Sequence, residues 1–140
     1  MNDRRFLFLV ASTREPGHTG NTEWLARQAA ATLAPEVQQQ WLHLAGMALP
    51  PFVDRRHTTG TYAPPEGDLK ALLDATLACT DLVFVSPVYW YSIPSQLKTY
   101  IDHWSGWPRC AATVSVSSGA YSSFCTAFRM SEGLVVASCG

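Results

Sequence analysis

The chain has 140 residues, of which 47% are hydrophobic and 15% are charged, and its formal net charge is −1. This length suits a single domain, because a chain of this size buries about 70% of its unfolded surface on folding. The small net charge excludes a general attraction to nucleic acid or to an anionic membrane. No apolar run reaches the ~20 residues of a membrane span, and residues 1–11 lack a signal-peptide core. We therefore expect a cytoplasmic protein.

The first part of the chain predicts a strand, a helix and a second strand. Phe6–Ala11 is uniformly apolar, which is typical of a strand buried on both faces of a parallel sheet. A polar segment, residues 12–22, separates it from an expected helix that Pro35 ends. Val37–Leu44 follows as a strand whose glutamines indicate a position near the sheet edge. The residues expected to share one face of the helix are Trp24, Leu25, Gln28, Ala29 and Leu33.

The second part predicts a helix, a buried strand and another helix. A proline-rich connection, residues 46–66, shows no sustained periodicity. The strand is the apolar run Leu82–Val85, and the loop 86–93 separates it from the helix Pro94–Ser105. The first helix carries its apolar stripe at Leu69, Leu72, Leu73, Thr76 and Leu77, and the second at Leu97, Tyr100, Ile101 and Trp104. Helices that alternate with apolar strands predict an α/β fold with a doubly wound parallel sheet.

Two loops follow the buried strands, and parallel strands would bring both loops to one sheet edge, where α/β proteins bind ligands. The loop 12–22 has the chemistry of a phosphate cradle, because glycines allow close approach and the next helix aims free N–H groups at the anion. The alternative is simple helix capping by Thr19, Asn21 or Thr22. Neither GxxxxGK[ST] nor GxGxxG is present.

The loop 86–93 suits a flat aromatic ligand. Backbone N–H groups from Val88 to Tyr91 are candidates to bond the polar edge of a ring system, and Tyr89, Trp90 or Tyr91 to pack on its face. The alternative is that these aromatic residues are core or dimer contacts.

The two loops together resemble those of the flavodoxin-like NAD(P)H-dependent FMN reductases. The similarity rests on Ser12, Arg14 and Gly20-Asn21-Thr22, and on the more specific pattern Ser86-Pro87-x-Tyr89-x4-Pro94-x2-Leu97-Lys98-x3-Asp102. It covers about Phe6 to Trp107. The resemblance implies a three-layer α/β/α flavodoxin-like domain that binds FMN, uses NADPH or NADH as co-substrate and forms a homodimer. The aromatic residues of helix Pro94–Ser105 are then candidates for the dimer interface.

Carried over by position, the resemblance assigns two groups of cofactor-binding residues. The first loop would hold the FMN phosphate and the second would line the isoalloxazine ring. The assigned residues are Ser12, Arg14, Gly20, Asn21 and Thr22 for phosphate, and Pro87, Val88, Tyr89 and Trp90 for the ring. No catalytic side chain and no metal site is expected, because the cofactor carries the chemistry. Lys98 and Asp102 are i, i+4 neighbours, and we interpret them as a surface ion pair.

The last third of the chain departs from the pattern. Residues 108–140 hold seven serines, three of the four cysteines and few charges, and they show no recognisable family residues. Ala112–Ser117 would be a fourth strand and Leu134–Ser138 a short fifth. Ser118 and Gly119 would belong to a third flavin-side loop, and no closing helix remains. We treat residues 1–140 as one domain and hypothesise a shortened or frame-altered family member.

The resulting hypothesis is an FMN-dependent NAD(P)H oxidoreductase. It would pass hydride from a nicotinamide through bound FMN to a small acceptor such as a quinone, a free flavin or a nitro or azo compound. One alternative is a flavodoxin-like electron carrier that binds FMN without using a nicotinamide. Another is a degenerate chain that binds nothing.

Overall fold

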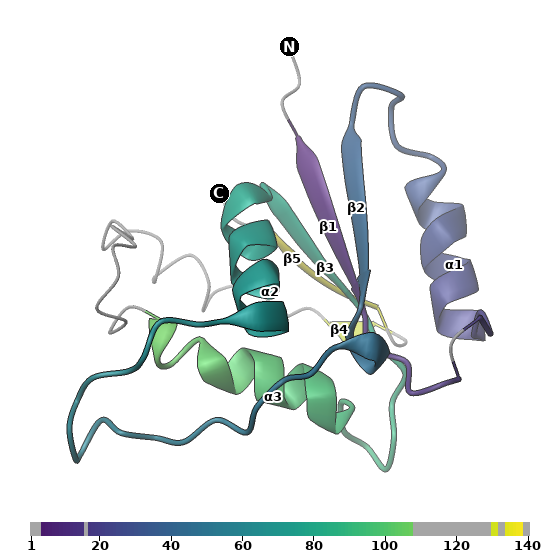
Figure 1. The fold of residues 1–140 in the computed structure, drawn as a ribbon. Helices are drawn as coiled ribbons and strands as arrows, with labels where there is room; N and C mark the ends of the chain where they lie inside the picture. The colour runs from purple at the N-terminus through teal and green to yellow at the C-terminus, as the bar shows by residue number, and fades with distance from the viewer. Residues whose placement is uncertain (1–3, 16, 108–129, 132–133, 139–140) are drawn as a thin grey trace.

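The computed structural model describes residues 4–15, 17–107, 130–131 and 134–138 as an α/β unit (Figure 1). Its strands are β1 (Arg5–Val10), β2 (Gln38–His43), β3 (Asp81–Val85), β4 (Met130–Ser131) and β5 (Leu134–Ser138). Its helices are α1 (Asn21–Ala30), α2 (Gly67–Ala78) and α3 (Ser95–His103), with a short 3-10 helix at Leu44–Gly46. The strand order is β2-β1-β3-β5-β4.

The first three strands are parallel and form the framework predicted from the apolar runs. β1 pairs with β2 on one side and with β3 on the other. Every residue of β3 is buried, as are the last four of β1, because both faces of these strands are covered by helices. β2 lies at the edge of the sheet and is largely exposed, which confirms the position indicated by its glutamines.

The strand Leu134–Ser138 has the predicted bounds, but it runs against the rest of the sheet. β5 pairs antiparallel with β3, from Asp81 opposite Ser138 to Val85 opposite Leu134. β4 pairs antiparallel with β5. The expectation of an entirely parallel sheet is therefore wrong for this part of the sheet. The predicted strand Ala112–Ser117 lies outside the described residues.

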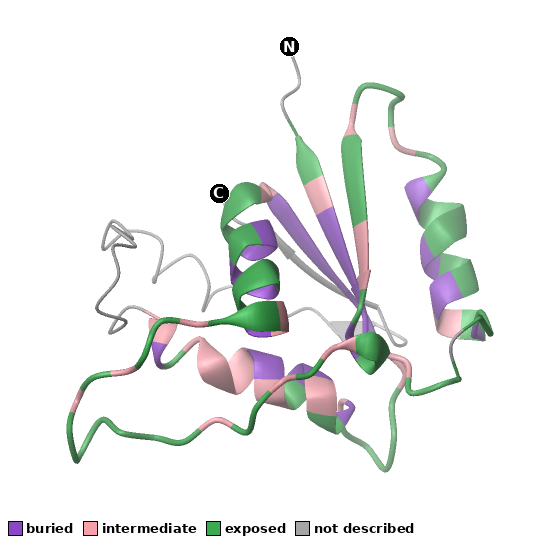
Figure 2. Ribbon diagram, viewed as in Figure 1, coloured by how far each residue is buried: buried purple, intermediate pink, exposed green. Residues whose placement is uncertain are grey.

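Helices cover the two faces of the parallel strands, as a three-layer arrangement requires. On one face, α2 and α3 pack against Leu7, Leu9, Leu82 and Phe84. On the other face, Ala26 and Ala30 of α1 pack against Phe8, Val10, Val83 and Val85. Figure 1 shows α1 and α2 on opposite sides of the sheet, and Figure 2 shows their buried residues facing it.

Three side-chain expectations are wrong. The helix α1 turns a different face to the sheet, so that Trp24 is 59% exposed and Leu25 is 50% exposed. Alanines suit that contact because the helix lies close to a strand face already filled by aromatic and branched side chains. Leu77 of α2 is also exposed.

The third expectation concerns the proposed interface on α3. Tyr100 is fully buried and stacks edge-to-face with Phe84, while Trp104 packs against both rings. Tyr100 of α3 therefore belongs to the core and provides no free surface for a partner. Trp104, the residue that follows α3, packs against the core and is partly buried.

Candidate functional site

The carboxyl ends of β1 and β3 lie side by side. Val10 pairs with Val85, and the N–H of Ala11 donates to the carbonyl of Val85 at 2.9 Å. Ser12 and Ser86 therefore leave the sheet at the same edge. Because the chain moves from β1 to β2 on one side and returns to β3 on the other, this edge is the switch point where ligands bind in such sheets. We call residues 12–15, 17–22 and 86–92 the two-loop site.

The first loop ends in an open helix N-terminus. Gly20 is the N-cap of α1, with φ −84° and ψ 166°, and no side chain caps the helix. The carbonyl of Gly20 accepts the first helical hydrogen bond, from the N–H of Trp24 at 2.9 Å. The alternative of side-chain capping by Thr19, Asn21 or Thr22 is thus not what the structure shows. The N–H groups of the first turn remain directed at a possible anion.

Glycine at position 20 allows the Arg14 side chain to cross the start of α1. A Cβ atom on Gly20 would lie 3.0 Å from Nε and 3.2 Å from Cδ of Arg14. The dihedral angles of Gly20 suit any residue, so a larger residue there would act by displacing the Arg14 side chain. Ser12 is half-buried, and its Oγ accepts a long hydrogen bond of 3.4 Å from the N–H of Arg14. The result is a guanidinium beside a helix N-terminus, which is a suitable pairing for phosphate.

The second loop forms a tight two-residue hairpin. Tyr89 and Ser92 exchange backbone hydrogen bonds of 2.9 Å and 3.0 Å. The two central residues, Trp90 and Tyr91, have φ values of 49° and 63°. Positive φ at both positions is the requirement of a type I′ turn, which normally selects Asn-Gly or Gly-Gly. Trp90 is 94% exposed and Tyr91 is 98% exposed, so the turn holds two aromatic rings in solvent.

A side-chain hydrogen bond joins the two loops. The hydroxyl of Thr13 donates to the hydroxyl oxygen of Tyr89 at 3.1 Å. This hydrogen bond lowers the pKa of Tyr89, with smaller contributions from Ser12 and from the positive charge of Arg14. Thr13 was not among the residues predicted for the site. It lies between the predicted residues Ser12 and Arg14, and its polar hydroxyl in this loop is the feature that could have identified it.

The structure brings most of the predicted residues together at this edge. Asn21 and Thr22 form the first turn of α1, and Pro87, Val88, Tyr89 and Trp90 follow β3. One detail of the prediction is wrong, because the N–H of Tyr89 already donates to Ser92 and is not available to a ring edge. The N–H groups of Val88, Trp90 and Tyr91 remain as candidates. Ser118 and Gly119 lie outside the described residues.

A buried carboxylate lies in the first turn of α1, next to the proposed phosphate site. Glu23 is 6% exposed in the first turn of α1, and its Oε1 accepts hydrogen bonds of 2.9 Å and 2.6 Å from Arg27. His43, the last residue of β2, places Nε2 3.1 Å from the same oxygen. Burial tends to raise the pKa of Glu23, but the hydrogen bonds from Arg27 and His43 outweigh it and the pKa is lowered. The sequence pattern gave no signal for this contact between α1 and β2.

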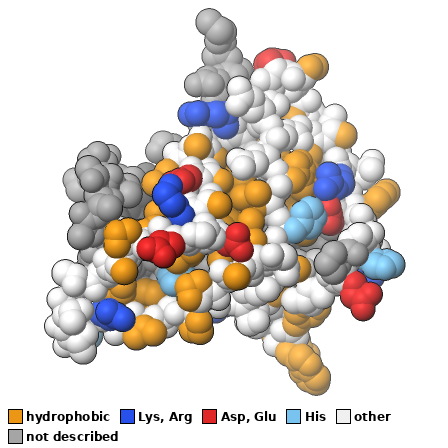
Figure 3. Space-filling view, viewed as in Figure 1, with side chains coloured by type: hydrophobic (Ala, Val, Ile, Leu, Met, Phe, Trp, Pro, Cys, Tyr) orange, Lys and Arg blue, Asp and Glu red, His pale blue; other side chains and the backbone are white. Residues whose placement is uncertain are grey.

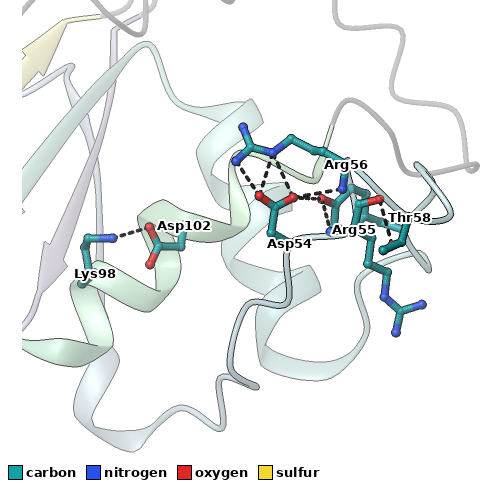
Figure 4. A network of polar contacts seen from close by, with 7 residues as sticks. Asp54, Arg55, Arg56, Thr58, Lys98 and Asp102 are labelled. Atoms are coloured by element: carbon teal, nitrogen blue, oxygen red, sulfur yellow. Dashed lines mark hydrogen bonds and ion pairs between the residues drawn. The ribbon is translucent and has the colours of Figure 1, made fainter.

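One further expectation concerns charged residues elsewhere. Lys98 and Asp102 form an exposed i, i+4 ion pair on α3, as interpreted from their spacing (Figure 4). Among the described residues, no three His, Cys, Asp or Glu side chains gather as metal ligands would. None of the helices in that part of the chain is long and apolar enough to cross a membrane.

The chain is similar to known proteins. The family described as NADPH-dependent FMN reductase matches residues 4–135 of the chain. A Bacillus subtilis (strain 168) relative, "Putative NAD(P)H-dependent FMN-containing oxidoreductase YwqN", is 33% identical over 86 residues. Those residues are 61% of this chain and 45% of the relative, so the match spans less than half of that protein. No solved structure matches the chain.

Proposed function

The chain belongs to the NADPH-dependent FMN reductase family, and from this premise we propose that it binds FMN at the two-loop site and acts as an NAD(P)H-dependent oxidoreductase. The observation that carries the proposal is the start of α1. An uncapped helix N-terminus, a glycine that a Cβ would obstruct and the Arg14 guanidinium meet at one point. This combination supplies directed N–H donors and a positive charge for a phosphate monoester.

The aromatic turn supports the other half of the same ligand. The hydrogen bond from Thr13 to the Tyr89 hydroxyl joins the turn 88–92 to the first loop, which would hold the phosphate. An isoalloxazine ring held there would meet the N–H groups of Val88, Trp90 and Tyr91 along a polar edge and aromatic faces beside it. Those N–H groups are the chain's means of stabilising negative charge on the ring.

The side chains of the site have a supporting role in this proposal. No described cluster there combines a nucleophile with a base, and the proposed role of the chain is to bind and orient the cofactor. Bound FMN would supply the chemistry of accepting hydride from a nicotinamide and passing it to a small acceptor. Quinones, flavins and nitro or azo compounds are the acceptors of the proposal. A homodimer, which the family resemblance implies, belongs to the same proposal and is checked by light scattering of the purified chain.

The test uses the purified full chain reconstituted with FMN. A flavin absorption band that is retained after gel filtration and bleached anaerobically by NADPH or NADH supports the proposal. If no band is retained, FMN binding is wrong. A retained band that neither nicotinamide bleaches would instead indicate an FMN-binding electron carrier.

A further inference from the structure

A pocket lies apart from the two-loop site. It is a pocket of about 460 Å³ between the proline-rich connection 47–66, the start of α2 and the end of α3. This volume is within the range of ligand sites. Figure 3 shows hydrophobic side chains over this part of the molecule, at the lower left, with a cationic group at the margin. Its lining includes Phe52, Arg55, Tyr62, Glu66, His103 and Trp107.

The wall of the pocket is an organised set of rings. Phe52 and Tyr62 stack with centroids 5.8 Å apart and an interplanar angle of 15°. His103 meets Phe52 edge-on at 5.5 Å, and its Nε2 lies 2.8 Å from the carbonyl oxygen of Pro50. A Cβ on Gly106 would lie 3.0 Å from the Tyr62 ring, so glycine is needed where α3 ends. Such a wall suits a planar, aromatic ligand such as a purine.

The pocket also has an available positive charge. Asp54 is bound by Arg56 through hydrogen bonds of 2.9, 3.0 and 2.6 Å and accepts another from Tyr62. The neighbouring Arg55 lines the pocket, and its guanidinium has no hydrogen bond or ion pair within the described part of the chain. Figure 4 shows its side chain directed away from the Asp54–Arg56 pair. A free guanidinium beside an aromatic wall is suited to phosphate.

The position of the pocket relates it to the proposed flavin site. α3 begins at Ser95, directly after the aromatic turn, and His103 at its end lines the pocket. Eight residues of helix separate the two positions by about 12 Å. An extended dinucleotide, which joins two nucleosides through a pyrophosphate, is long enough to cover such a distance. Its two ring systems would then occupy the two sites.

We propose that this pocket binds the adenosine end of the nicotinamide dinucleotide, with Arg55 on the 2′-phosphate of NADPH. The adenine ring would lie against Phe52 and Tyr62, and the Glu66 carboxylate is available to accept from a ribose hydroxyl or the adenine amine. The inference rests on the proposed function for its nicotinamide partner. It adds what the two-loop site does not determine, which is selection of NADPH over NADH.

The first test measures binding without flavin or turnover. Isothermal titration of the full chain with 2′,5′-ADP and with 5′-AMP compares ligands that differ in the 2′-phosphate. We expect 2′,5′-ADP to bind at least 10-fold more tightly, because only its 2′-phosphate can accept charge-assisted hydrogen bonds from the Arg55 guanidinium. Arg55→Gln should abolish the difference, Arg55→Lys should restore part of it, and Lys70→Ala, which removes an exposed charge from α2, should leave it intact. Equal affinity of the wild-type chain for the two ligands would overturn the proposal.

The second test separates this inference from the proposed function. With FMN-loaded protein, Arg55→Gln should raise the KM for NADPH about 10-fold or more while leaving the KM for NADH and the affinity for FMN unchanged. Equal effects on NADPH and NADH, or no effect on either, would refute the role of Arg55 while leaving flavin-dependent oxidation standing. If the wild-type chain binds no FMN, the proposed function fails, and the titration with 2′,5′-ADP still decides whether the pocket recognises adenosine 2′-phosphate.

Discussion

At the residue scale, the turn at Trp90 and Tyr91 is the least expected feature of the chain. Aromatic residues in the left-handed region cost about 1–2 kcal/mol each, because Cβ approaches the following carbonyl oxygen. Both side chains lie in solvent, so no packing within the described residues compensates for that cost. Strain of this kind is found where backbone geometry serves a ligand. We interpret the strain of this turn as the cost of presenting its two rings and its N–H groups at the sheet edge.

Replacing the turn by its preferred sequence should stabilise the protein and weaken the site. For Trp90→Asn combined with Tyr91→Gly, we expect the free energy of unfolding of the apo protein to rise by about 1–2 kcal/mol, since both residues tolerate positive φ. Urea unfolding measures this change, and flavin titration should show weaker binding. Leu77→Gln is the control, because it removes an exposed apolar side chain from a helix without changing backbone strain. A turn variant less stable than wild type would show that the aromatic rings make stabilising contacts.

Gly20 provides the second test at this scale. Gly20→Ala places a methyl group against the Arg14 side chain, and the backbone angles accept alanine. We expect the free energy of unfolding to stay the same or rise by about 0.4–1 kcal/mol, while FMN binds about 10-fold more weakly and riboflavin binds as before. Gly46→Ala, where a Cβ meets nothing within 4 Å, is the matched control. An unchanged affinity for FMN would remove Arg14 and Gly20 from the phosphate site.

At the scale of elements, the Glu23 carboxylate fixes α1 to the end of β2. Its partners are Arg27, one turn along the same helix, and His43 on the strand. This link determines where the N-terminus of α1 points, and hence where a phosphate would be held. The same contact explains why the predicted face of α1 was wrong. A paired glutamate occupies a buried position that a hydrophobic pattern assigns to Trp24 or Leu25.

The Glu23 link has a defined pH dependence. The folded-state pKa of Glu23 is lowered, so its stabilisation is complete above the unfolded pKa of about 4.3 and is lost as the pH falls through the folded value. We expect Glu23→Gln to cost about 1–3 kcal/mol at pH 7. That difference from wild type should shrink below about pH 4. Unfolding measured from pH 7 to pH 3 checks this, with Glu36→Gln at an exposed position as control. A difference that does not change with pH would contradict the role of the ionised carboxylate.

At the scale of the whole molecule, the parallel strands could be predicted from the sequence because their cause is local. Strands buried on both faces must be continuously apolar. The runs Phe6–Ala11 and Leu82–Val85 meet this requirement. That both loops leave the sheet at the same edge follows from the parallel direction of β1 and β3 alone. The direction of β5 could not be predicted from the sequence, because an apolar run such as Leu134–Ser138 can pair parallel or antiparallel with its neighbour. The strained turn could not be predicted for a different reason. Its central residues are Trp90 and Tyr91, whereas turns with positive φ at both positions usually contain Asn and Gly.

The N-terminus of α1, with Gly20 and Arg14, is the proposed binding site for the phosphate of a flavin mononucleotide. The most direct measurement compares FMN with riboflavin, which lacks only the phosphate, by quenching of flavin fluorescence on titration with the full chain. Two charge-assisted hydrogen bonds predict that FMN binds about 100-fold more tightly than riboflavin. Equal affinity for the two flavins would contradict the claim.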